Sequence, residues 1–326
     1  MKHYGHLTSE ERAQLELLHK QGHGPTSIGQ QLRRAKSTVS RELRRGPGGG
    51  SYAAARAHAA AQLLRAKARR LSRRTAARTA EIRAHLAQGW SPQQIAGRWA
   101  QQGRPAGERL SPESIYAVIE ADRKAGGTLW QMLPRGGRKR RRDRCGTRRG
   151  HRLKVTPAQE IAARPAEINE RRRGGDWEVD LIIGAGQQGV LLVAVERQSR
   201  VVRCRALKSK EAAEVARALV PLLGAGVVRT LTYDRGLEWM RHAAIAAALG
   251  AVSYFCRPYH SWEKGSVENM NGLLRRYIPK GVSFPYEEVD HVWLQEVETA
   301  LNDRPRRQHG YRTPAEVARE RAESAA

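Results

Sequence analysis

Three carboxylates in the second half of the chain have the types and spacing that metal-dependent phosphoryl transfer requires. Asp180 lies in the apolar string DWEVDLIIG, Asp234 ends the apolar string VVRTLTYD, and Glu268 lies in WEKGSVENMNGLLRRYI. A buried strand rarely carries an aspartate, because an unpaired charge away from water is very costly. Two aspartates on strands followed by a glutamate on a helix therefore indicate that a bound cation compensates the charge.

Carboxylate oxygens of this kind suit Mg²⁺ or Mn²⁺, with water and a substrate phosphate completing an octahedron. Two such ions would activate the attacking oxygen and stabilise the leaving oxygen of an in-line displacement at phosphorus. Asp176 and Glu178 share the strand face of Asp180, so the first ligand could be any of the three; Asp180 is favoured because apolar residues follow it directly. Each acid taken alone could be an ordinary cap, turn residue or surface charge, and only their combination favours a metal site.

The elements that must position these carboxylates predict a mixed sheet with helices on its faces. Apolar, β-like runs are expected at 177–183, 190–195, 201–207, 228–233 and 252–255, and helices at 210–223, 238–249, 263–278 and 287–301. Three strands followed by alternating helices and strands are typical of an α/β domain. Asp234 would then lie at the carboxyl end of a strand, where open α/β sheets usually bind their ligands.

Nearly all of the net positive charge lies in the first half of the chain. The chain has 326 residues and a formal net charge of +27. Residues 1–152 hold 33 Lys+Arg against 10 Asp+Glu, whereas residues 153–326 hold 26 against 22. A half-chain this basic attracts a polyanion such as DNA. Neutralisation of phosphates, which releases their counterions, is the expected contribution to the binding free energy. A solvated basic surface is the alternative, but helix-turn-helix patterns in the same half favour DNA.

Residues 1–46 have the pattern of a helix-turn-helix DNA-binding domain. Thr8 and Glu11 have the spacing of a capping box before a first helix, and a last helix opens at Lys36. The outward side of that last helix is expected to contact DNA through Ser37, Thr38, Ser40, Arg41 and Arg44. The alternative is a plain three-helix bundle with a polar face.

The rest of the chain divides into linkers, a second reading unit and the domain that carries the acids. We expect a basic helical linker at 47–78, a second helix-turn-helix-like unit at 79–134, a basic linker at 135–170 and the α/β domain at 171–326. Residues 135–152 hold ten Lys/Arg and one acid, so this stretch cannot fold alone and should meet phosphates. Further DNA contacts are expected at Arg138, Lys139, Arg140 and Arg141, and at Arg275 beside Glu268.

Composition disfavours several other classes of protein. The chain has no run of about 18 apolar residues, so no membrane span is expected, and its N-terminus lacks the apolar core of a signal peptide. The three cysteines, Cys145, Cys204 and Cys256, form no CxxC pair, which supports neither a disulfide framework nor a zinc finger. We therefore expect a protein of the reducing cytoplasm.

With these residues identified, the chain resembles the insertion sequence 30 family of bacterial DDE transposases over nearly its whole length. The matching strings are EERAQLELL, KSTVSRELRR, WSPQQIAGRW, SPESIYAVI, GDWEVDLIIG, TYDRGLE, YFCRPYHSWEKGSVENMNGLLRRYIPKG and LNDRPRRQHGYRTPAEV. The resemblance implies a multidomain chain with N-terminal all-α helix-turn-helix units and an RNase H-like catalytic core of the integrase type. It implies that Asp180, Asp234 and Glu268 form a Mg²⁺-binding triad. One departure is Val179, where the family more often has glycine.

The resemblance also implies a function. A transposase of this kind binds the terminal inverted repeats of its insertion sequence, cleaves DNA strands and transfers the freed 3′-OH ends to target DNA. It is expected to act in the bacterial cytoplasm at the nucleoid, as a homo-oligomer that is at least a dimer on DNA. The alternative is a catalytically inactive, sequence-specific DNA-binding regulator with the same fold, and the intact triad favours the enzyme. A nuclease of this fold without strand transfer would differ only in its products.

Overall fold

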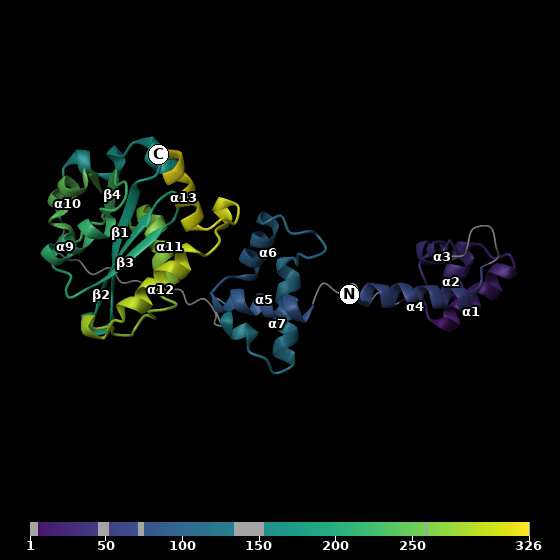
Figure 1. The fold of residues 1–326 in the computed structure, drawn as a ribbon. Coiled ribbons are helices and arrows are strands. Elements are labelled where there is room, and N and C mark those ends of the chain that lie inside the picture. The colour runs from purple at the N-terminus through teal and green to yellow at the C-terminus, as the bar shows by residue number, and fades with distance from the viewer. Residues whose placement is uncertain (1–5, 45–51, 71–74, 134–152, 259, 326) are drawn as a thin grey trace. The chain divides into compact units, whose positions relative to one another are not determined.

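The computed structural model describes residues 6–44, 52–70, 75–133, 153–258 and 260–325. These form two compact units, residues 1–75 and residues 76–326 (Figure 1). The basic residues expected to contact DNA at 138–141 lie outside the described residues. No described helix is long and apolar enough to cross a membrane.

The first unit is helical, as its sequence predicts. Its described helices are α1 (Ser9–Lys20), α2 (Pro25–Gln31), α3 (Lys36–Leu43) and α4 (Ala54–Arg70). The expected capping box begins α1: the Glu11 amide donates to Thr8 Oγ1 at 3.1 Å, and the Thr8 amide donates to Glu11 Oε2 at 2.8 Å. The capping box thereby satisfies two backbone N–H groups at the start of the helix.

The core of this unit extends beyond the three predicted helices. Leu15, Ile28 and Val39 are fully buried, one from each of the first three helices. Tyr52 and Ala57, from the segment expected to be a linker at 47–78, are buried against them. The start of that segment therefore contributes to the core of the first unit rather than acting only as a spacer.

The second unit begins with another helical part, α5 (Ala76–Ala87), α6 (Pro92–Gln101) and α7 (Pro112–Lys124). Ser91 and Ser111 cap the last two helices through their hydroxyl groups, as the Ser-Pro pairs predict. Gly97 of α6 lies against the ring of Tyr311, where an added Cβ would stand 2.4 Å from ring atoms. This close approach requires glycine and joins the helices to the C-terminal part of the same unit.

A five-stranded mixed sheet forms the rest of the second unit. Its strands are β1 (Asp176–Ile183), β2 (Val190–Glu196), β3 (Val202–Leu207), β4 (Thr230–Tyr233) and β5 (Val252–Phe255), in the order β3-β2-β1-β4-β5. β1, β2 and β3 pair antiparallel, and β1, β4 and β5 pair parallel. The predicted multidomain architecture, with all-α parts before an α/β domain that has a mixed sheet, is confirmed.

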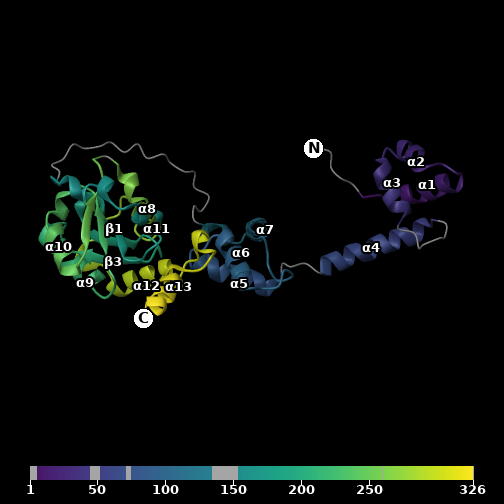
Figure 2. The same ribbon diagram turned by 90° about the horizontal axis from the view of Figure 1, so that it is seen from above.

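Helices cover both faces of this sheet (Figures 1 and 2). The covering helices are α9 (Ala212–Leu223) and α10 (His242–Leu249) on one face and α11 (Gly265–Leu274) and α12 (His291–Asn302) on the other. Two more helices of this part of the chain are α8 (Ala166–Glu170) and α13 (Pro314–Ala325). Short 3₁₀ turns lie at Leu129–Met132, Pro157–Gln159, Ile161–Ala163, Ala185–Gln187, Leu237–Trp239, Ser261–Lys264, Tyr286–Glu288 and Arg307–His309. The helix predicted at 263–278 is shorter in the structure, and α13 was not predicted.

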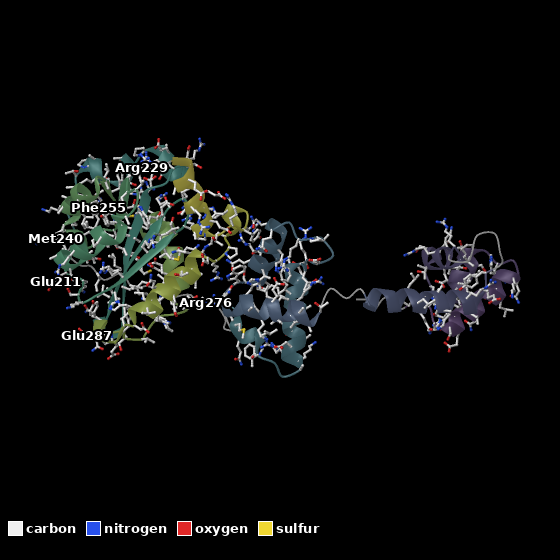
Figure 3. All side chains as sticks on the ribbon, in the orientation of Figure 1. Glu211, Arg229, Met240, Phe255, Arg276 and Glu287 are labelled. Carbon is white, nitrogen blue, oxygen red and sulfur yellow. The ribbon has the colours of Figure 1, made fainter. Side chains whose placement is uncertain are left out.

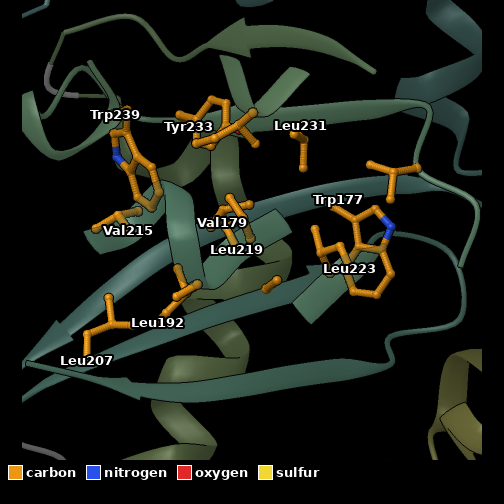
Figure 4. Packing of buried hydrophobic residues seen from close by; sticks show 14 of the residues in the cluster. Trp177, Val179, Leu192, Leu207, Val215, Leu219, Leu223, Leu231, Tyr233 and Trp239 are labelled. Carbon is orange, nitrogen blue, oxygen red and sulfur yellow. The ribbon is translucent and has the colours of Figure 1, made fainter. Parts of the chain in front are cut away.

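Alternation along β1 decides which side chains face which helices. Trp177 and Val179 pack into the core cluster that α9 and α10 cover (Figure 4). Ile182 belongs to the opposite cluster, which contains residues of α11 and α12. Because side chains alternate along a strand, the acids of β1 also face α11. Val179 is fully buried and belongs to the core cluster on the α9 side of the sheet.

The segment 153–170, assigned to a linker by its sequence, packs against the sheet. Ile168 is fully buried, and the buried side chain of Arg164 donates to Thr232 Oγ1 at 3.2 Å. The Leu153 amide donates to the carbonyl of Arg235 at 3.0 Å. The sequence gives no local signal for these contacts, because their partners lie about 70 or more residues further along the chain.

Candidate active site

The register of the sheet places Asp180 beside Asp234. In the parallel pair, Asp176 of β1 faces Thr230 of β4, and Glu178 faces Thr232. In each pair the residue of β4 lies 54 positions after its partner in β1. Asp234 likewise lies 54 positions after Asp180, so the same register places the two aspartates opposite each other. Asp234 directly follows β4, so its side chain lies at a strand end next to that of Asp180.

The buried ammonium group of Lys264 lies between these two carboxylates. Its Nζ is 3.1 Å from Asp180 Oδ1 and 3.4 Å from Asp234 Oδ2, and its side chain is only 4% exposed. It also donates to the carbonyl of Val179 at 3.2 Å. Burial disfavours the charged amine, but Asp180 and Asp234 outweigh burial and hold the pKa of Lys264 above its usual range. Sequence reasoning missed this residue, although a lysine four positions before Glu268 was a visible signal.

Further donors fix the orientation of both aspartates. Asn271 of α11 donates to Asp180 Oδ2 at 2.7 Å, and Trp239 Nε1 donates to Asp234 Oδ1 at 2.8 Å. The amide of Gly236 adds a third bond, to Asp234 Oδ1, at 3.1 Å. Burial opposes ionisation of Asp234, but Lys264 and these donors hold its pKa below the usual range. Asp234 is therefore a carboxylate at neutral pH.

The other two acids of β1 are committed to structural partners. Glu178 is fully buried and accepts hydrogen bonds from Arg197 at 2.5 Å and from the amides of Ser266 and Val267 at 2.7 and 2.9 Å. Asp176, also buried, accepts from Thr230 Oγ1 at 2.7 Å. The side chain of Asp180, by contrast, is 27% exposed. The geometry thus favours Asp180 over its two neighbours as a ligand that substrate and solvent can reach.

Glu268 lies on the side of α11 that faces the aspartates. Lys264 is one turn before it and Asn271 is three residues after it, and both contact Asp180. The Glu268 side chain itself is exposed. Within the described ranges no three His, Cys, Asp or Glu side chains are grouped closely enough to hold a metal ion. The structure therefore brings Asp180 and Asp234 together and leaves the Glu268 carboxylate outside that pair.

The pair of aspartates fits a divalent cation by its donor chemistry. Their oxygens converge on one positively charged group, the Lys264 ammonium, at 3.1 and 3.4 Å. A position where two carboxylates already stabilise a cation is one where a hard ion such as Mg²⁺ or Mn²⁺ finds the oxygen ligands it prefers. Asp234 is also 45% exposed, so an ion can reach the pair from solvent.

The predicted DNA-contact residues of α3 lie mostly on its accessible side. Ser37, Arg41 and Arg44 are exposed, and Thr38 and Ser40 are half-buried. Arg41 Nε donates to the carbonyl of Ser37 at 3.1 Å, which directs the guanidinium along the helix surface. In the second unit, Arg275 is half-buried and donates to the carbonyl of Ile183 at 3.3 Å.

One buried ion pair behind α3 was not foreseen from the sequence. Arg12 Nε of α1 is 2.6 Å from Glu42 Oε1 of α3, with side chains 2% and 4% exposed. Arg12 also donates to the carbonyl of Leu7 at 2.6 Å. The pair fixes α3 against α1 while leaving the opposite side of α3 accessible.

Known proteins match both parts of the chain. A family model described as a helix-turn-helix domain matches residues 3–46. The chain is 36% identical over 315 residues to the transposase for insertion sequence element IS4351 of Bacteroides fragilis, covering 95% of this chain and 94% of the relative. It is 32% identical over 325 residues to transposase InsI for insertion sequence element IS30C of Escherichia coli K12, covering 96% of this chain and 83% of the relative. The crystal structure of the catalytic core domain of BIV integrase matches 46% of this chain and 97% of that chain, with 21% identity and a TM-score of 0.36.

Proposed function

The chain belongs to the insertion sequence 30 family of bacterial transposases, and from this premise we propose that it binds the terminal inverted repeats of its element, cleaves DNA strands there and joins the 3′-OH ends to target DNA. Asp180, Asp234 and Glu268 would hold two Mg²⁺ ions, or Mn²⁺. The observation that carries the proposal is the convergence of Asp180 and Asp234 on one buried cation at 3.1 and 3.4 Å.

Each residue around the aspartates has a physical role in this proposal. Asn271 and Trp239 orient the two carboxylates by hydrogen bonds of 2.7 and 2.8 Å, so their oxygens remain directed to a common point. Lys264 compensates the repulsion between Asp180 and Asp234 in the free protein. When bound, divalent ions supply the charge that activates an attacking oxygen and stabilises a leaving oxygen at phosphorus.

The remaining parts of the proposal concern DNA and assembly. The exposed side of α3 would read the end sequence, and the basic residues 138–141 would contact phosphates. In the free protein Arg275 donates a hydrogen bond to the carbonyl of Ile183. To contact the DNA strand, its guanidinium would replace this bond with one to the DNA. Because two element ends must be joined, at least a dimer would act on DNA, in the cytoplasm at the nucleoid.

Removal of single ligand charges tests the proposed chemistry. Asp180→Asn, Asp234→Asn and Glu268→Gln each keep the shape of the side chain and remove the anionic ligand, so cleavage and strand transfer should be lost while end binding persists. The assay is incubation of purified protein with its own element ends and Mg²⁺, with products mapped to the nucleotide. Glu287→Gln is the matched control, because Glu287 is an exposed acid at the edge of the same domain (Figure 3).

Two outcomes would contradict parts of this proposal. A ligand variant that cleaves at a near wild-type rate is not part of the triad. If the unaltered protein binds the ends specifically but cleaves nothing with Mg²⁺ or Mn²⁺, the chain is a DNA-binding regulator that keeps the transposase fold.

A further inference from the structure

A second cluster of charge lies on another side of α11, outside the aspartate pair. A groove of about 680 Å³ is lined by four arginines, Arg171, Arg200, Arg306 and Arg307. They come from the end of α8, the turn before β3 and the segment before α13. Residues of α11, among them Ser266 and Asn269, form the adjoining wall. The fold therefore gathers arginines from distant segments beside the helix that carries Glu268.

The charges of these four arginines are not neutralised by direct ion pairs in the described structure. Among the described residues, none of the four groove arginines forms an ion pair. Elsewhere Arg197 pairs with Glu178, and Arg235 pairs with Glu160 at 2.9 Å. Four arginines that line one groove without an ion pair among the described residues make the groove positive.

Burial makes that uncompensated charge unfavourable in the free protein. Burial, followed by the nearby charge of Arg171, lowers the pKa of Arg200 to about 10. Burial and the neighbouring Arg304 and Arg200 lower the pKa of Arg306 to about 10. Within the described structure, Arg306 Nε is also buried without a hydrogen-bond acceptor. An anion in the groove would relieve the repulsion and satisfy the donor.

The backbone gives a third, independent observation. Arg171 has φ 58° and Arg200 has φ 68°, both in the left-handed region that favours glycine or asparagine. A non-glycine residue is strained there, and such strain collects at functional sites. At both positions the chain therefore has a long cationic side chain where glycine would be the relaxed choice.

We propose that this arginine groove binds the phosphodiester backbone of double-stranded DNA beside the strand that is cut, an inference that rests on the proposed function. The planar guanidinium fork matches two phosphate oxygens, and it carries no information about base sequence. The amides of Ser266 and Val267 are already bonded to Glu178, so the arginines, not the helix end, supply the recognition. α11 then serves both sites, with Asn271 directed to Asp180 and Ser266 toward the groove.

The test removes the two exposed groove charges from the full-length protein. Arg171→Gln/Arg307→Gln should preserve the fold, because both side chains lie at the surface. Binding of a fluorescein-labelled random-sequence duplex is measured against salt in EDTA, in an Asp234→Asn background, so that cleavage plays no part. The slope of log affinity against log salt concentration should become shallower by about 1–2. Each phosphate contact contributes about −0.9 to that slope, and the variant loses up to two contacts.

Two further double variants distinguish loss of charge in the groove from loss of charge anywhere on the domain. Arg217→Gln/Arg229→Gln removes the same charge from exposed positions elsewhere on the domain, and its slope should match the unaltered protein (Figure 3 labels Arg229). Arg171→Lys/Arg307→Lys keeps both positive charges, so its slope of log affinity against log salt should stay close to that of the unaltered protein.

Equal slopes for the groove double and its control would overturn the inference. A second contrary result combines two measurements. If Arg171→Gln/Arg307→Gln leaves the salt slope for DNA unchanged but abolishes binding of a polyglutamate peptide, the groove binds an acidic protein partner instead. Because the measurement needs no cleavage, failure of the groove and failure of the triad are separate results.

Discussion

The two units of the molecule each bury a cation beside carboxylate groups, but the carboxylates differ in their access to water. In the first unit Arg12 Nε lies 2.6 Å from Glu42 Oε1, and both side chains are almost fully enclosed. In the second unit a single ammonium, that of Lys264, serves both Asp180 and Asp234, which are 27% and 45% exposed. An enclosed pair of this kind holds helices together. Two carboxylates that share one ammonium and reach water can accept another cation.

The strongest test of this contrast breaks the enclosed pair of Arg12 and Glu42. Arg12→Met leaves Glu42 buried without its cation, so the free energy of unfolding of the first unit should fall by about 3–5 kcal/mol. Hydrogen exchange of the amides in α1 and α3, followed through urea denaturation, measures the loss. Arg12→Met/Glu42→Met should recover most of it, because both charges are then gone. A double variant as unstable as the single one would show that the pair does more than balance charge.

The corresponding change in the second unit is Lys264→Met. In EDTA the two aspartates then repel without compensation, and stability should fall by about 2 kcal/mol or less, since water screens partly exposed charges. Mg²⁺ should raise the melting temperature of this variant more than that of the unaltered protein. Lys210→Met is the control, because that exposed lysine bonds Gln187 and no carboxylate. An identical response to Mg²⁺ in Lys264→Met and the unaltered protein would refute this interpretation of the two aspartates.

The accessible side of α3 should affect recognition without affecting stability. Arg41→Ala should reduce the preference for the element end over random DNA by about 1–3 kcal/mol, the value of a good bidentate base contact. Affinities for both DNAs at two salt concentrations measure it. Lys20→Ala, an exposed change on α1, should leave the ratio unaltered. If Arg41→Ala also leaves it unaltered, the reading helix is elsewhere, and the second helical unit around residues 111–116 is the next candidate.

The smallest expected effect concerns the cap of the first helix. Thr8→Ala removes the acceptor for the Glu11 amide and should cost about 1 kcal/mol of stability in the first unit. Thermal melting of Thr8→Ala and Thr8→Ser separates the cap from general packing, because serine retains the hydroxyl. Equal losses in both variants would mean that the Thr8 methyl group matters more than its oxygen.

The fold was largely predictable because its signals are local. Apolar runs marked the five strands of the sheet, and Ser91, Ser111 and the Thr8–Glu11 pair marked helix starts by their side-chain chemistry. Element ends were less certain: α12 begins at His291 rather than 287, since the intervening residues form a separate short turn. The assignment of 135–170 to a linker failed from residue 153 onward, because burial of Arg164 and Ile168 depends on distant strands.

The candidate site was predictable only in part. Asp180 and Asp234 could be placed from strand patterns, and the structure sets them side by side. The choice of Asp180 over Glu178 rested on a weak pattern, because the partners that occupy Glu178 lie 19 and 88 residues away. Lys264 and the arginine groove depend on tertiary contacts between distant segments, which spacing along the chain does not report. The role of Glu268 stays a prediction.

The two-residue spacing between Glu178 and Asp180 has a consequence for how such a gene can change. One strand face presents both side chains, so Glu178 anchors the start of α11 while Asp180 meets Lys264. A one-codon insertion between them would rotate one of the two to the tryptophan side of the sheet. A change of length within this stretch would therefore inactivate the copy in a single event.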